Sequence, residues 1–505
     1  MKRLILLLFF CATSAMGQTP SRVQVAFCPD SGATGSSPQS TTPDYRCPLP
    51  EPVQAGNAIV FSFFSDNGSA PTFTVTTLKN DYTNTGDTWS CPSSVTSAGT
   101  NITKICISVN ITGGGRWVNL HSSSNRPFQV AIAEEWTNIS QTSGTVVTAS
   151  TCTQDANGTS ITAGSITPGN GDALIQTAFN NGNGTSAITT SFTKGSQGTN
   201  VVWNLDGADI NDSRLSAEVA QSGVSLGTAA FNPTLTSAST GVYISCVMSL
   251  KAASAGSLPS QAFRAILMIH QNTPNASGGG TVTTDAQVNA TGGNLIVIAF
   301  ADAGGKLVTP SNDSLGNSYT CTAAAINGAT SANFCYAQNP TVSDSMIVHM
   351  TRADNTNDGT FMVYVFAGAA ASSFDAVSTG ETGTQNNQLP LTTCTTCLST
   401  AQANEMVIGA AQWLNCTATN NTAPTVTGGQ FDAAQSTNNN VDGPETVDQN
   451  GGWFHGLRAS SGTFNTTWTM VCGASNISNW AGQTIAFKAP TGKSCTIALT
   501  GAGPC

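Results

Sequence analysis

Side chains that could carry out acid–base, nucleophilic or metal chemistry are sparse in this 505-residue chain. Charged residues make up 9% of it, against roughly 25% in a typical soluble protein, and there are four histidines. Serine-nucleophile, zinc-protease and phosphate-loop motifs are absent from the sequence. His121, His270 and His349 each lie in an alternating or apolar run, which favours a position on a strand. We therefore predict no catalytic residue, and an enzyme is the less favoured interpretation.

Two acidic groupings remain as candidates. Glu134 and Glu135 are adjacent, and adjacent side chains of a strand point to opposite faces, so they cannot form the facing carboxylate pair of a glycosidase. Glu135 alone is a candidate ligand-binding residue on a sheet face, the alternative being a solvated carboxylate at a strand end. Asp206, Asp209 and Asp212 are candidate calcium ligands, since calcium takes roughly six to eight oxygens; a solvated loop is the alternative.

Aromatic side chains provide a third candidate site. Sugar-binding sandwiches hold pyranose rings against flat aromatic faces, and Trp453, Phe454 and His455 follow one another between glycines. The segment 233 positions earlier, 218–223, contains no aromatic residue, so a shared fold does not demand these three. They are candidate ligand-binding residues for a glycan, and core packing is the alternative.

The N-terminus and the cysteines indicate export. Residues 1–17 resemble a secretory signal peptide, with Lys2 and Arg3 before a short apolar run and a small-x-small site ending at Gly17. No stretch is long and apolar enough to suggest a membrane span. We expect a secreted protein, extracellular or at the cell surface.

Removing the segment that contains Cys11 leaves an even number of cysteines, which in an oxidising compartment favours disulfides over metal sites. Loop-flanking positions and chain ends suggest the pairs, although spacing does not fix connectivity. Cys394 and Cys397 could form a small loop bridge or pair separately. The other predicted pairs are Cys91 with Cys106, Cys321 with Cys335, Cys28 with Cys47, Cys495 with Cys505, and, as weaker suggestions, Cys152 with Cys246 and Cys416 with Cys472.

The chain contains an internal duplication. The segment 171–175 matches 404–408, and Phe231-Asn232 matches Phe464-Asn465, both 233 positions apart. Strand-entry turns at 56–60 and 293–297 match at a nearby offset of 237, as loop insertions would produce. The predicted organisation is a signal peptide (1–17), copy one (18–252), a linker (253–260), copy two (261–490) and a C-terminal tail (491–505).

The pattern within each copy favours an all-β fold. Short β-branched runs are bounded by Gly, Asn, Asp or Ser, and convincing helical periodicity is absent. Regular short strands separated by turns are typical of antiparallel sandwiches. We predict two tandem antiparallel β-sandwich domains, each one jelly-roll-like unit of about 230 residues. The alternative is two smaller immunoglobulin-like sandwiches in each copy, formed from two related halves.

Copy two resembles a known kind of module. It contains Gly293-Asn294-Leu295-Ile296-Val297, the turn 313–319 (DSLGNSY), Phe334-Cys335-Tyr336-Ala337 and 404–409 (NEMVIG). These motifs are similar to those of jelly-roll-like β-sandwich modules that occur in tandem in secreted bacterial proteins. Copy one departs at the DSLGNSY turn but keeps 135–137 (EWT). The resemblance implies the fold and secretion; that family has no established activity to carry over.

Composition narrows the choice of partners. The formal charge is −10, and the 17 Lys and Arg residues are spread thinly, which excludes nucleic acid as a partner. We predict a secreted, non-catalytic protein for adhesion, matrix or glycan contact, with an extracellular glycan or a cell-surface component as partner. The alternatives are a self-associating surface or filament subunit and a secreted polysaccharide-acting hydrolase or lyase. No cofactor other than calcium is expected.

Overall fold

The molecule is built from β-strands. A computed structural model describes residues 19–28, 44–65, 72–79, 83–97, 101–123, 129–155, 158–180, 191–195, 201–210, 217–253, 263–273, 282–302, 308–328, 330–352, 359–385, 398–414, 425–427, 449–458, 461–464, 467–469 and 477–490. Within these ranges the secondary structure is strands and loops, which confirms the predicted all-β class. No helix that could cross a membrane occurs among them.

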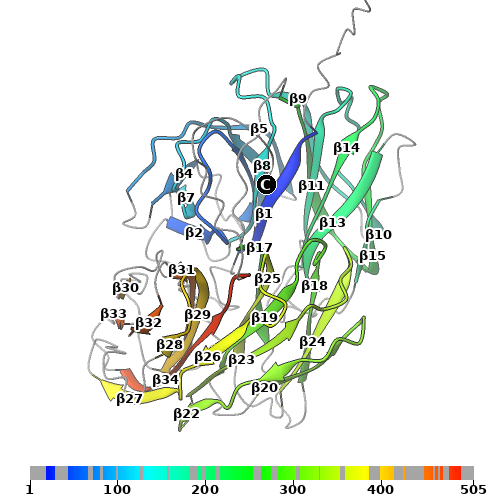
Figure 1. Cartoon of the computed structure of the whole chain (residues 1–505). Coiled ribbons are helices and arrows are strands. Elements are labelled where there is room, and N and C mark those ends of the chain that lie inside the picture. The colour runs from blue at the N-terminus through cyan, green and yellow to red at the C-terminus, as the bar shows by residue number, and fades with distance from the viewer. Residues whose placement is uncertain are drawn as a thin grey trace, which may run out of the picture.

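The largest sheet combines strands from both halves of the chain (Figure 1). Its spatial order is β21-β23-β19-β25-β17-β1-β8-β3-β6-β5, and β22 pairs with β23. We call it the central sheet. Its strands are β21 (Thr320–Cys321), β23 (Thr330–Gln338), β19 (Leu295–Asp302), β25 (Gly359–Ala367), β17 (Arg264–Thr273), β1 (Ser21–Phe27), β8 (Gln129–Thr137), β3 (Ala58–Ser65), β6 (Asn101–Ser108), β5 (Trp89–Ser97) and β22 (Ala325–Asn327).

The central sheet is covered on both faces, which explains its continuous apolar runs. All eight residues of β3, AIVFSFFS, are buried. In β19, Val297 and Ala299 belong to one core, whereas Ile296 and Ile298 belong to the core on the opposite face. A strand buried on both faces loses the apolar–polar alternation of a half-exposed strand.

A second large sheet covers one of these faces. Its order is β20-β24-β18-β13-β14-β11-β16-β9, and all its pairings are antiparallel. Phe179 and Ile244 from this sheet share a core with Phe27 and Ile132 of the central sheet. The strands are β20 (Val308–Asp313), β24 (Met346–Arg352), β18 (Val282–Val288), β13 (Val201–Ile210), β14 (Glu218–Ser225), β11 (Ala173–Asn180), β16 (Tyr243–Leu250) and β9 (Val147–Gln154).

Smaller sheets complete the layers. The sheets β2-β7-β4 and β26-β34-β29-β31, with β27 paired to β34, share a core with the other face of the central sheet. The sheet β10-β15-β12 covers the outer face of the second large sheet, where Leu235 of β15 shares a core with Ala178 and Leu205. The pairs β28-β32 and β30-β33 form two further small sheets. Their strands are β2 (Asp44–Pro48), β7 (Trp117–Ser122), β4 (Phe73–Leu78), β26 (Phe374–Val377), β34 (Ile477–Phe487), β29 (Glu405–Leu414), β31 (Gln449–Arg458), β27 (Glu381–Gln385), β10 (Gly158–Thr162), β15 (Thr234–Gly241), β12 (Phe192–Thr193), β28 (Leu398–Thr400), β32 (Gly462–Phe464), β30 (Thr425–Thr427) and β33 (Thr467–Thr469).

One strand order recurs along the chain. The orders β1-β8-β3-β6-β5, β9-β16-β11-β14-β13 and β17-β25-β19-β23-β21 each place the first strand beside the last and the third in the middle. We name the successive parts segment one (21–137), segment two (147–250), segment three (264–367) and segment four (374–487). In segment four, β29 likewise lies between β34 and β31.

The segments are joined by continuous sheets, across the predicted boundary between the two copies. Strand β1 pairs with β17 in parallel, with Val25 opposite Leu267, so the central sheet runs from segment one into segment three. Strand β13 pairs with β18, with Ala208 opposite Gln287, and this joins segment two to segment three. Backbone hydrogen bonds therefore connect parts of the chain that are far apart in sequence.

Among the described residues, four disulfides hold the margins of the sheets, as is typical of extracellular proteins. Three join an edge strand to its neighbour: Cys91 of β5 with Cys106, Cys152 of β9 with Cys246, and Cys321 of β21 with Cys335. The fourth, Cys28 with Cys47, ties the end of β1 to β2. All four pairs were suggested by the sequence. The remaining predicted pairings involve Cys394, Cys397, Cys416, Cys472, Cys495 and Cys505, which lie outside the described residues.

We expect the edge disulfides to differ in their contribution to stability. The bond between Cys152 and Cys246 closes a separation of 94 residues, and that between Cys91 and Cys106 closes 15. Loop-closure entropy predicts that replacing the first pair by alanine lowers the free energy of unfolding by about 4 to 5 kcal/mol, and the second by about 3 kcal/mol. Urea unfolding of the two variants measures the difference. Equal losses would contradict an entropic origin.

Candidate functional site

Two of the candidate ligand-binding residues, Glu135 and His455, belong to one polar network in the interior. Glu135 lies on β8 in the central sheet, and His455 lies on β31 of segment four. Both side chains are buried. The network that connects them is built from segments one, three and four.

Glu135 accepts three hydrogen bonds. They come from the Gln24 side chain at 2.5 Å, the Asn57 side chain at 2.6 Å and the backbone N–H of Gln54 at 2.8 Å. Burial raises the pKa of Glu135, while the three donors and the Arg264 charge act in the opposite direction. The carboxylate that was expected on an open face or at a strand end is therefore enclosed by partners.

Gln24 links Glu135 to Glu51. Its amide nitrogen also donates to the Glu51 carbonyl at 3.0 Å, and its amide oxygen accepts the Glu51 N–H at 2.6 Å. The Glu51 carboxylate in turn accepts the backbone N–H of Ala265, at the start of β17, at 2.9 Å. This chain of hydrogen bonds ties segment one to segment three.

His455 brings segment four into the same network. Its Nε2 atom donates to the carbonyl of Pro50 and lies 3.8 Å from the Glu51 carboxylate. The imidazole packs edge-on against the rings of Tyr364 and Phe366, with centroids 5.1 and 5.9 Å away. Burial and the nearby Arg116 charge lower the pKa of His455 to about 3, so the ring is neutral at physiological pH.

The aromatic candidates beside His455 are core residues in this structure. Trp453 is fully buried, donates from its indole nitrogen to the Ala299 carbonyl at 3.1 Å, and packs edge-on against His270. Phe454 points to the other face of β31, where a Cβ on Gly409 would lie 1.8 Å from its ring. Neither ring offers a free face to a sugar in this conformation.

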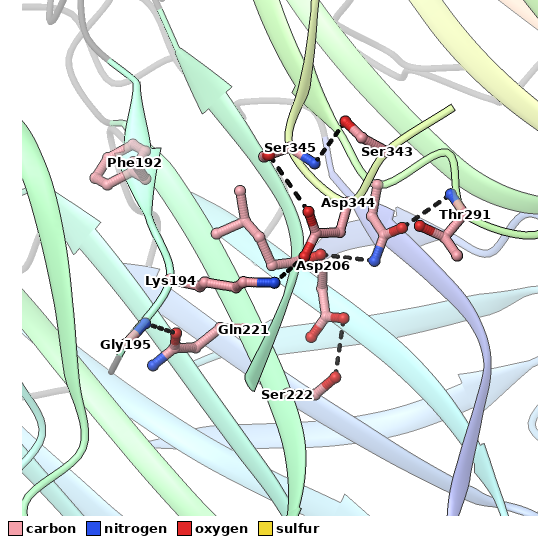
Figure 2. A network of polar contacts seen from close by, with 12 residues as sticks. Phe192, Lys194, Gly195, Asp206, Gln221, Ser222, Thr291, Ser343, Asp344 and Ser345 are labelled. Carbon is pink, nitrogen blue, oxygen red and sulfur yellow. Dashed lines mark hydrogen bonds and ion pairs between the residues drawn. The ribbon is translucent and has the colours of Figure 1, made fainter. Parts of the chain in front are cut away.

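A second cluster lies on the opposite face of β8. Glu134 accepts the indole N–H of Trp136 at 2.9 Å, and Asp206 of β13 forms an ion pair with Arg22 of β1. Figure 2 shows Ser222 donating to Asp206, at 2.9 Å. Glu134 and Asp206 are both 1% exposed, and each has one carboxylate oxygen without a partner among the described residues.

A bulge in β1 directs one polar side chain into the Glu135 network and another into the Glu134–Asp206 cluster. The register of β1 against β8 shifts between Arg22 and Gln24, so Arg22 faces Trp136 and Gln24 faces Glu135. In a regular strand these two side chains, two positions apart, would share a face. The extra residue re-aims one of them, as bulges commonly do. Arg22 therefore reaches segment two, and Gln24 reaches the side of segment four.

The two carboxyl groups of the second cluster, Glu134 and Asp206, differ in their protonation. Burial, together with the nearby Asp206 charge, raises the pKa of Glu134 from 4.5 to about 8. Burial also raises the pKa of Asp206, but Arg22 and Ser222 favour its ionised form. We infer that Glu134 carries a proton at neutral pH and that Asp206 remains the partner of Arg22.

The predicted calcium cluster is divided. Asp206 is occupied by Arg22 and Ser222, Asp209 lies further along β13 opposite Glu218, and Asp212 lies outside the described residues. Groups of three or more His, Cys, Asp or Glu arranged to hold a metal were not found in the described part of the chain. The calcium site stays a prediction.

Sequence reasoning missed Arg22, Gln24 and Glu51. The first two sit in the otherwise apolar strand SRVQVAF, and isolated polar residues in such a run often mark a buried polar contact. Their partners are 184 and 111 residues away, which no local pattern reveals.

Comparisons of the chain with family models, with curated proteins and with solved structures found no match. The chemical role of these residues is therefore inferred from their geometry alone. The four groups best suited to acid–base work, Glu134, Glu135, Asp206 and His455, are each at most 2% exposed. In this conformation they hold the segments together, and a substrate would not reach them.

Proposed function

We propose that the chain is a secreted, non-catalytic protein that contacts extracellular glycans through its polar sheet faces, with each segment a jelly-roll-like sandwich. The recurring strand order, first strand beside the last and third in the middle, supports this interpretation of the segments. The four disulfides support an extracellular location.

The observation that carries the proposal is a row of hydroxyl groups on the outer sheet β10-β15-β12. Ser160 and Thr193 pair in register with Thr236 from either side, and all three residues are exposed. Neighbouring strands lie about 4.8 Å apart, so three hydroxyls line up across the sheet. In a weakly charged chain, such a row suits hydrogen bonding to a neutral polysaccharide better than to a polyanion.

The edges of the two large sheets favour this function over that of a strand-paired filament subunit. Strand β5 contains Pro92 within a register shift, and β20 contains Pro310 at another. Proline has no N–H to donate, and bulges twist an edge away from a straight partner. The edge strands β5, β9 and β21 are moreover tied inward by their disulfides.

Binding to insoluble neutral polysaccharides tests the proposal. We expect the oxidised full-length protein to co-sediment with at least one member of a panel, with no release of soluble sugar. Replacing Ser160 by alanine, and Thr193 and Thr236 by valine, removes three hydroxyls at nearly constant shape. At about 0.5 to 1.5 kcal/mol for each lost hydrogen bond, we expect affinity to fall about tenfold or more.

A matched control variant removes three exposed hydroxyl groups from a different sheet. Ser90, Ser94 and Thr96 lie on edge strand β5 and are exposed. Alanine at the two serines and valine at the threonine should leave sedimentation unchanged. Equal loss in both variants would discard the hydroxyl row, and failure to bind any polysaccharide would discard glycan contact.

A further inference from the structure

The layer between segment four and the central sheet contains two of the four histidines of the chain. His270 projects from β17 of the central sheet, and His455 projects from β31 of segment four. Trp453 lies against His270, with ring centroids 5.4 Å apart, and Tyr364 lies against His455 at 5.1 Å. Both imidazoles are at most 3% exposed, so they are part of the packing between the two sheets.

We propose that this layer is an acid-sensitive latch, in which proton uptake by His270 and His455 releases the sheet β26-β34-β29-β31 of segment four from the central sheet. The proposal concerns the fold itself and does not depend on glycan contact. It would let an extracellular protein expose the apolar faces of two sheets when its surroundings become acidic.

The contacts of His455 suit the neutral ring only. Nε2 donates to the Pro50 carbonyl, whereas Nδ1 is buried and has no hydrogen-bond partner among the described residues. Protonation would place an N–H on Nδ1 without an acceptor and a second cation near Arg116. A buried donor left unpaired, with a charge removed from water, disfavours the docked state.

The other titratable and charged groups around the His455 ring do not stabilise its protonated form enough to keep the sheets docked. Glu51 is the carboxylate nearest to His455, but it already accepts the Ala265 N–H. Glu135 is held by its three donors, and Arg264 acts on Glu135. Tyr364 is neutral, since burial raises the pKa of its hydroxyl. The attraction of the Glu51 carboxylate for a protonated His455 is therefore opposed by the Arg116 charge and by burial.

The sign of the pH dependence follows from linkage. Burial lowers the pKa of His270 to about 3, as it does for His455 together with Arg116, from the ordinary value of 6.5. A released state, with ordinary pKa values, takes up protons below pH 6.5 that the docked state refuses until about pH 3. For each unit by which the pH falls below 6.5, one histidine thus raises the equilibrium constant for release of the sheet by up to about tenfold. Two histidines raise it by up to about a hundredfold.

Hydrogen exchange of the oxidised full-length protein at pH 7 and pH 4.5, corrected for intrinsic rates, tests the latch. We expect acid to reduce protection of β29, β31 and β34 while β3 and β8 remain protected. Loss of protection spread evenly over these strands in the wild-type protein would overturn the proposal, and this outcome requires no variant.

Substitutions assign the effect to the two histidines. His455→Gln keeps a donor towards the Pro50 carbonyl, and His270→Phe keeps an aromatic edge for Trp453, but neither can take up a proton. The double variant should lose the acid-induced exposure of segment four. His121→Gln with His349→Gln is the matched control and should retain it. Acid-induced exposure that persists in the His270/His455 double variant would overturn the proposal.

Discussion

Replacing Arg22 by methionine is expected to lower the free energy of unfolding by about 3 to 5 kcal/mol. The substitution keeps the length of the side chain but leaves the Asp206 carboxylate, which is 1% exposed, without its cation. Removing one partner of a buried pair costs the desolvation of the remaining charge, and this exceeds the attraction that is lost. Urea unfolding at pH 7 measures the change.

A double-mutant cycle separates the charge from the packing. Asp206→Asn added to Arg22→Met removes the stranded charge and should restore most of the lost stability. The control is Lys194→Met at the exposed ion pair with Asp344, where we expect a loss below about 1 kcal/mol. If Arg22→Met and Lys194→Met were equally mild, the Arg22 pair would not hold segments one and two together.

Glu134→Gln should stabilise the protein at alkaline pH. Because burial and Asp206 raise the pKa of Glu134 from 4.5 to about 8, the folded state holds a proton that the unfolded chain has already released. The stabilisation from this proton is complete below pH 4.5 and is lost as the pH rises through 8, at up to about 1.4 kcal/mol per pH unit. Glutamine is neutral throughout and still accepts the Trp136 N–H.

Unfolding free energies measured at half-unit steps from pH 5 to pH 8 test this expectation. Over this range the variant should gain stability relative to the wild type by up to about 1.4 kcal/mol per pH unit, because the contributions of His270 and His455 are common to both proteins and cancel in the difference. The far-UV spectrum at each pH serves as the control for a native fold. A variant that is less stable than the wild type by the same amount at every pH would show that Glu134 is ionised in the folded protein.

The all-β class could be predicted because its determinants are local. The turns at Gly56-Asn57 and Gly293-Asn294 were identified as strand entries, and the apolar runs after them form β3 and β19. The matched segments 171–175 and 404–408 likewise lead into β11 and β29. Each of these strands lies between two partners in its sheet. A turn residue followed by a β-branched apolar run specifies such a strand without information from the rest of the chain.

The way in which the segments join could not be read from the sequence. Pairing of β1 with β17 depends on which two edges meet, and neither strand carries a local signal that identifies its partner. The sequence favoured one sandwich for each copy, but the sheets continue from one copy into the other. Register between distant strands is decided by the packing of whole faces, which a local pattern does not encode.

The candidate site was predicted by residue type but not by environment. Glu135 and His455 were singled out as candidate ligand-binding residues, with a solvated strand end as the alternative for Glu135 and core packing as the alternative for His455; both lie in the interior. Glycines flank Trp453, Phe454 and His455, and they lie within β31, a ten-residue strand in which Trp453 and His455 share one face. Small residues there make room for large neighbours, as Gly409 does for Phe454.

We propose that the buried acidic groups join the segments and that the exposed hydroxyl row of β10-β15-β12 contacts the glycan. Release of soluble sugar from a polysaccharide panel, measured side by side for the wild-type protein and Glu135→Gln, tests it most directly. We predict that the polysaccharide retains the wild-type protein and that neither protein releases sugar. Sugar release by the wild type that disappears in Glu135→Gln would contradict the claim and make the buried network an active site.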